Sequence, residues 1–113
     1  MDGNLFEDIP VGAGAEQFLP LLERGGVTIE RIVSHGHVTP GDGWYDQPQG
    51  EWVVVLRGAA RLRFEDETCD RVLAAGDWVD IAPRRRHRVA WTDPAVPTVW
   101  LAVHYRVGPA GSE

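Results

Sequence analysis

The chain has 113 residues, of which 43% are hydrophobic and five are Trp, so it is long enough for one folded core and too short for two domains. Its formal net charge of −6 gives no electrostatic reason to bind nucleic acid, and we expect no such partner. The single Cys69 cannot form an internal disulfide, and no long apolar run indicates a signal peptide or a membrane span, so we predict a cytoplasmic protein without membrane contact.

The N-terminal segment, residues 1–26, predicts one short helix over 15–23. Its apolar residues are Phe18, Leu19, Leu21 and Leu22. Pro20 interrupts this helix, and two glycines that follow at positions 25 and 26 end it. We expect the helix to cover one end of the domain.

From residue 27 onward the hydrophobic period changes to two, which predicts β-strands. The predicted strands are 27–34, 51–57, 59–65, 71–73, 77–81, 86–91 and 98–105. Many short strands with almost no helix indicate an all-β sandwich or barrel over residues 27–107. Residues 108–113 are predicted to be a flexible tail.

Two of these strands have a titratable residue at or next to their first position, at a fixed distance from a glycine. Glu51 lies seven residues before Gly58, and His87 lies eleven residues after Gly76. These spacings resemble the two-motif signature of the cupin superfamily, over roughly residues 27–105. The resemblance implies a double-stranded β-helix, the jelly-roll barrel, around one internal cavity.

The first motif departs from the family pattern at its two histidines. A three-residue spacer before Glu51 places them at Tyr45 and Gln47, and a four-residue spacer places them at Trp44 and Asp46. We favour the first register because family members often carry a proline directly after the second histidine, as Pro48 follows Gln47 here. Neither histidine is present in either register, so the resemblance does not imply an intact site of three histidines and one glutamate.

Strand alternation predicts which side chains share the cavity. If Glu51 faces inward, Val53 does too, and if His87 faces inward, Trp91 does too. Trp44, Asp46, Val53, Trp91 and His104 are therefore candidate pocket residues, with the orientation of His104 and the register of the first motif left open.

Three classes of function fit this set of residues. Gln47, Glu51 and His87 could hold a divalent Fe, Mn, Ni, Cu or Zn ion in an oxygenase, isomerase or lyase that acts on a small metabolite. Alternatively, His87 removes a proton and Tyr45 supplies one, without a metal, as in cupin-like sugar epimerases. The third class is a binding or sensing module for a small molecule.

Two other polar clusters have simpler interpretations. His35 and His37 form a His-x-His pair, but a loop rich in Gly and Pro separates them from Glu51, so we predict that they are not ligands. The arginines at positions 84–86 are either a solvated turn or a contact for an anionic substrate, and we favour the turn.

The outward face of the strand 51–57 is apolar. Trp52, Val54 and Leu56 alternate with the residues expected to face the cavity. Apolar patches of this kind usually mark interfaces, so we predict a homodimer.

Overall fold

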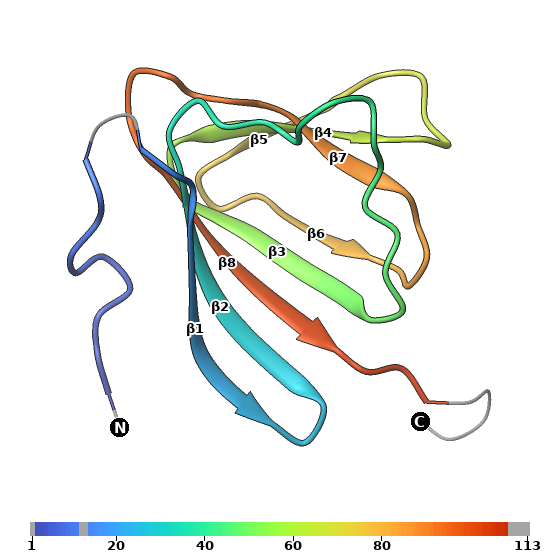
Figure 1. Cartoon of the computed structure of the whole chain (residues 1–113), viewed down its shortest axis with the longest axis horizontal. Coiled ribbons are helices and arrows are strands. Elements are labelled where there is room, and N and C mark those ends of the chain that lie inside the picture. Colours follow the sequence, from blue (N-terminus) through green and yellow to red (C-terminus); the bar gives the residue numbers. More distant parts are fainter. Residues whose placement is uncertain (1, 12–13, 109–113) are drawn as a thin grey trace.

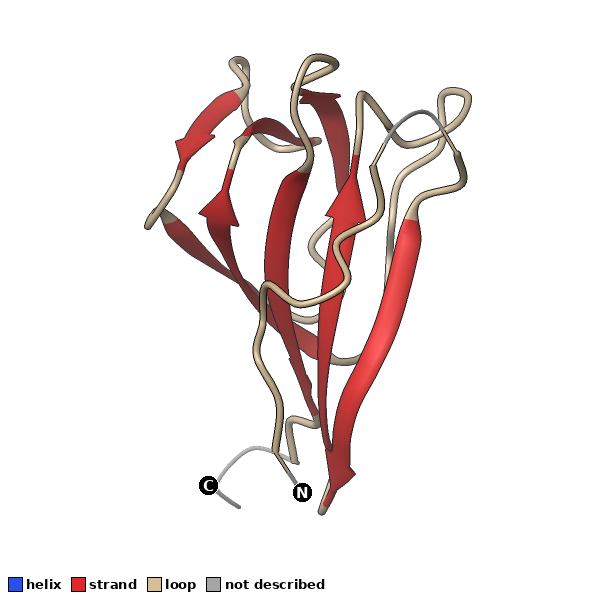
Figure 2. Ribbon diagram, turned by 90° about the vertical axis from the view of Figure 1, so that its left-hand side faces the viewer, coloured by secondary structure: helices blue, strands red, loops and turns tan. Residues whose placement is uncertain are grey.

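The computed structural model describes residues 2–11 and 14–108, and all regular structure within these ranges is β-strand (Figure 2). The strands are β1 (Gln17–Arg24), β2 (Val27–Ser34), β3 (Gly50–Arg57), β4 (Ala59–Phe64), β5 (Arg71–Ala74), β6 (Trp78–Ile81), β7 (His87–Thr92) and β8 (Thr98–Tyr105). The all-β prediction is therefore confirmed. The same ranges contain no helix that is long and apolar enough to span a membrane. Of the predicted tail, residues 109–113 lie outside the described residues.

The strands form two antiparallel sheets that face each other (Figure 1). The larger sheet has the order β1-β2-β8-β3-β6, and the smaller one has the order β5-β4-β7. Strands that are distant in sequence are neighbours in both sheets, and β2 pairs with β8 along its whole length. This arrangement is the jelly roll.

The core lies between the sheets and is built by alternate residues of the facing strands. Val53 and Val55 of β3, and Leu62 and Phe64 of β4, are at most 3% exposed. Burying a side chain of this size contributes about 1.5–3 kcal/mol. The remaining members of this buried cluster are Ala60, Leu73, Val79, Ile81, Trp100 and Ala102. The two-residue period therefore decides which side chains of β3 and β4 face inward.

The helix predicted over residues 15–23 is wrong, because these residues mostly belong to the edge strand β1. An edge strand tolerates Pro20, since one of its two rows of N–H groups has no strand to pair with. A β-bulge between Pro20 and Leu22 lets the pairing with β2 continue beyond the proline. Pairing with β2 thus overrides the helical spacing of the leucines, and the sheet begins at Gln17, ten residues before the predicted position 27.

The segment before β1 is fixed to the sheet by a buried arginine. Arg31 of β2 is 3% exposed, and its Nη1 donates to the main-chain oxygens of Leu5 and Glu7. Its Nη2 donates to Gln17 Oε1 at 2.8 Å. These contacts hold the segment around residues 5–7 against β2.

Candidate functional site

A cavity of about 210 Å³ is bounded by residues of both sheets. By area most of its wall is apolar, and this part is formed by Phe18, Ile32, Val38, Val53, Leu62, Ile81, Val89 and Trp100. The polar residues of the wall are Glu16, Glu30, Thr39, Tyr45, Gln47, Glu51, His87 and His104. A largely apolar cavity in which a few polar groups converge is the usual form of a small-molecule site.

Six residues that were selected from the sequence line this cavity, namely Tyr45, Gln47, Glu51, Val53, His87 and His104. The wall contains Tyr45 and Gln47 rather than Trp44 and Asp46. The structure therefore has the register with the three-residue spacer before Glu51.

Glu51 and His87 meet because they lie on facing sheets, near the start of β3 and at the start of β7. His87 Nε2 is 3.5 Å from Glu51 Oε1, and Gln47 Nε2 donates to the same oxygen at 3.1 Å. Tyr45 forms an isolated antiparallel bridge with His87, and their ring centroids are 5.7 Å apart. The bridge fixes the loop that carries Tyr45 and Gln47 against β7.

One nitrogen of the His87 ring is occupied by the main chain. Nδ1 lies 2.8 Å from the carbonyl oxygen of Arg85, which can only accept a hydrogen bond, so Nδ1 carries a hydrogen. The ring is 3% exposed and cannot turn freely. Nε2 is therefore the nitrogen that takes up or releases a proton, and it faces Glu51.

Glu51 and His87 stabilise each other as an ion pair. Burial raises the pKa of the Glu51 carboxyl, but the contacts with His87, His104 and Gln47 outweigh it, and the pKa lies below 4.5. Burial lowers the pKa of His87, but Glu51 and the Arg85 carbonyl outweigh it, and this pKa lies above 6.5. At 3.5 Å the contact between the two side chains is long for a hydrogen bond, so we attribute the attraction mainly to charge.

These pKa shifts predict how the pair contributes to stability at different pH. The contribution of His87 is complete below 6.5 and is lost as pH rises through its higher folded pKa. The contribution of Glu51 is complete above 4.5 and is lost as pH falls through its lower folded pKa. The His87→Gln variant should therefore lose more unfolding free energy at about pH 5.5 than at about pH 8.5, as measured by denaturant titration. Equal losses at the two pH values would contradict the ion pair.

Two carboxylates on the cavity wall, Glu30 and Glu16, are not among the residues selected from the sequence. Glu30 of β2 lies 3.1 Å from His104 Nε2, and both side chains line the cavity. Alternation along β2 could have identified Glu30, since Ile32 lies on the same face. Glu16 precedes β1, where the predicted helix concealed the strand pattern.

Three predicted pocket residues lie outside the cavity wall. A β-bulge between β4 and β7 places Trp91 opposite Arg61, whose guanidinium lies 5.3 Å from the centroid of the indole ring. The bulge reverses the alternation after Val89, so Trp91 does not follow His87 inward. Trp44 lies beneath Arg88, 5.9 Å from its guanidinium, and Asp46 forms surface ion pairs.

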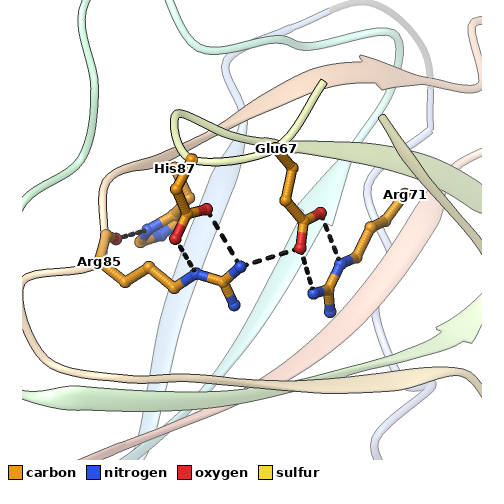
Figure 3. A network of polar contacts seen from close by, with 5 residues as sticks. Glu67, Arg71, Arg85 and His87 are labelled. Atoms are coloured by element: carbon orange, nitrogen blue, oxygen red, sulfur yellow. Dashed lines mark hydrogen bonds and ion pairs between the residues drawn. The ribbon is translucent and has the colours of Figure 1, made fainter. Parts of the chain in front are cut away.

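The arginines at positions 84–86 are paired with acidic side chains outside the cavity. Arg84 and Arg86 contact Asp46, at 3.3 and 3.4 Å. Figure 3 shows that Arg85 reaches Glu67, which also binds Arg71. These contacts match the interpretation of the cluster as a solvated turn.

His35 and His37 also lie away from the cavity wall. His37 Nδ1 accepts the main-chain N–H of His35 at 2.8 Å, and its Nε2 lies 2.6 Å from the Gly14 carbonyl oxygen. Both ring nitrogens of His37 therefore have main-chain contacts, one in its own loop and one in the segment before β1.

The donor set beside Glu51 does not fit a tightly held transition metal. It contains one imidazole, one carboxylate and one carboxamide, whereas catalytic metal sites commonly use three strong ligands. Gln47 Nε2 donates to Glu51 Oε1, and His87 Nε2 approaches the same oxygen. Across residues 2–11 and 14–108, no three His, Cys, Asp or Glu side chains form a group suited to a metal ion.

Comparisons with known proteins agree on the fold. Residues 34–104 match the model of the Cupin domain family. A crystal structure from Ralstonia eutropha JMP134, of a protein provisionally assigned as a mannose-6-phosphate isomerase, is 54% identical with a TM-score of 0.91, and the match covers 95% of this chain and 99% of that one. A cupin superfamily protein from Desulfitobacterium hafniense is 14% identical with a TM-score of 0.71, over 88% of this chain and 84% of that one. No curated protein matches the chain.

Proposed function

This chain belongs to the cupin domain family, and on that premise we propose that it is an isomerase-type enzyme that moves a proton on a small organic substrate without a metal. The cupin fold alone does not choose this activity, because one fold can carry many reactions. The observation that supports it is the arrangement of Tyr45, Glu51 and His87 on one cavity wall, with His87 Nε2 as the titrating atom.

In this proposal, the neutral form of His87 removes a proton from the substrate through Nε2. Glu51 stabilises the imidazolium that results, and the Arg85 carbonyl keeps the ring in position. Tyr45, whose ring is next to His87, donates a proton to the substrate oxygen. Positioned acid and base groups typically accelerate proton transfer by about 10²–10⁴-fold.

The provisional assignment of the protein from Ralstonia eutropha supports the reaction class. At 54% identity over nearly the whole of both chains, an isomerase is a reasonable expectation for this chain. The assignment does not identify the substrate, because the arginines at positions 84–86 lie outside the cavity wall and meet acidic side chains.

Deuterium exchange tests the proposal with a small panel of sugars, because it detects proton removal even when no product accumulates. The protein is incubated in D₂O with mannose, mannose 6-phosphate or glucosamine, and proton NMR follows the hydrogen on the carbon next to the carbonyl. We expect the protein to accelerate exchange or isomer formation in at least one of the three. If none reacts faster than in buffer, the acid–base proposal is wrong and a binding or sensing role replaces it.

We also propose that the protein is a homodimer. The outer face of β3 is extended by Trp78 of β6, which is 60% exposed and whose ring lies 5.9 Å from that of Trp52. Large exposed aromatic side chains are typical of interfaces. Sedimentation should show a dimer, and Trp78→Glu should shift it to the monomer. A wild-type monomer at every concentration tested would contradict this assembly.

We propose the cytoplasm as the compartment of the protein. Cys69 is exposed and forms no disulfide. Reducing compartments keep such thiols free.

A further inference from the structure

Glu16 is the one carboxylate on the described cavity wall without a histidine beside it. Glu51 contacts His87 and Glu30 contacts His104, whereas Glu16 accepts a hydrogen bond from the Ser34 hydroxyl. No ion pair of Glu16 is present among residues 2–11 and 14–108. The Glu16 carboxylate is thus available to a charged partner that the chain itself does not supply.

A buried chain of hydrogen bonds holds this carboxylate in place. Trp100 Nε1 donates to Ser34 Oγ at 3.2 Å, and Ser34 in turn donates to Glu16. Ser34 is fully buried and Trp100 is 3% exposed, so both donors are rigid. Orientation by buried neighbours is what a binding group requires.

The formal charge of the cavity wall is negative in every protonation state of its histidines. The wall has three carboxylates, Glu16, Glu30 and Glu51, and two imidazoles, His87 and His104, so its formal charge is −3 with neutral rings and −1 with both rings protonated. Within the described ranges, the wall contains no Lys or Arg. Charges in such a site are poorly screened, so an anion is repelled and a cation is attracted.

We propose that Glu16 is a specificity-determining residue, which binds the protonated amine of a small substrate with an aliphatic body. An ammonium group donates three hydrogen bonds, and the Glu16 carboxylate has free acceptor sites beyond the one used by Ser34. The aliphatic body would contact the apolar wall, which includes Ile32 and Val38. This inference rests on the proposed function only in taking the cavity as the substrate site.

Three probes with one carbon skeleton test this selectivity: isobutylamine, isobutanol and isobutyrate. Near neutral pH they present an ammonium, a hydroxyl and a carboxylate, respectively. Binding is followed in nitrogen–proton NMR spectra through the indole N–H signal of Trp100, which is linked to Glu16 through Ser34. The amine should bind at least about tenfold more tightly than the alcohol, since hydrogen bonds to charged groups are the stronger ones. Isobutyrate should bind most weakly.

The Glu16→Gln variant, which keeps the size of the side chain and removes its charge, should weaken amine binding about tenfold and leave alcohol binding unchanged. Glu23→Gln is the matched control, because Glu23 lies on β1, the strand that directly follows Glu16, but not on the cavity wall. Isobutyrate binding as tight as amine binding, no saturable amine binding, or equal effects of the two variants would each overturn the proposal.

These measurements are independent of turnover, so the two proposals fail separately. Amine preference without deuterium exchange in any sugar would contradict only the proposed function. Exchange without amine preference would contradict only the role of Glu16.

Discussion

Replacing His87 with Gln should slow substrate deuterium exchange at least about 100-fold, because Gln at this position has no ring nitrogen to take up the proton. Gln preserves an amide that can still donate toward the Arg85 carbonyl, so the fold should persist. Initial rates from proton NMR measure the effect. His37→Gln is the matched control, since His37 does not line the cavity, and its rate should equal that of the wild type.

The pH dependence of the same rate distinguishes a catalytic role of His87 from a structural one. Only the neutral ring accepts a proton, so the rate should rise as pH passes through a pKa that lies above 6.5. Burial lowers the pKa of His87 and Glu51 raises it. Glu51→Gln should therefore lower this pKa and move the rise in rate to lower pH. A rise that stays at the same pH in Glu51→Gln would contradict the coupling of the two groups.

The largest effect on stability is expected from Gly58→Ala. Gly58 joins β3 to β4 with φ of +89°, a backbone conformation that residues other than glycine rarely adopt. A Cβ atom there would lie 2.8 Å from Thr98 Cα and 3.0 Å from the Pro97 oxygen. Both are main-chain atoms that cannot turn aside, so the variant must distort the start of β8.

Gly76→Ala distinguishes the cost of the backbone conformation from the cost of the close contacts with Thr98 and Pro97. Gly76 has a similar φ of +94°, but an added Cβ would meet nothing within 4 Å. The control should lose about 1–2 kcal/mol of unfolding free energy from its backbone conformation alone. Gly58→Ala should lose at least about 2 kcal/mol more, as measured by denaturant titration. Equal losses would show that the contact with the loop before β8 is unimportant.

Strands with a clear two-residue period could be predicted from the sequence. Those at 27–34 and 98–105 have the bounds of β2 and β8. β1 was missed because its leucines are spaced as on a helix, and the pairing with β2 that decides the matter is not local.

The candidate site could be predicted only where spacing along the chain carries the information. Glu51 and His87 lie at fixed distances from Gly58 and Gly76, and these spacings place both side chains on the cavity wall. Trp91 was misplaced because a β-bulge has no clear sequence signal when no glycine marks it.

Nitrogen NMR of the His87 imidazole during a pH titration directly tests the role of Nε2 as the titrating atom, because it reports which ring nitrogen carries the hydrogen and at which pH the other one is protonated. We expect a hydrogen on Nδ1 throughout, protonation of Nε2 with a pKa above 6.5, and a lower pKa in the Glu51→Gln variant. A titrating Nδ1, or a pKa that Glu51→Gln leaves unchanged, would contradict this expectation.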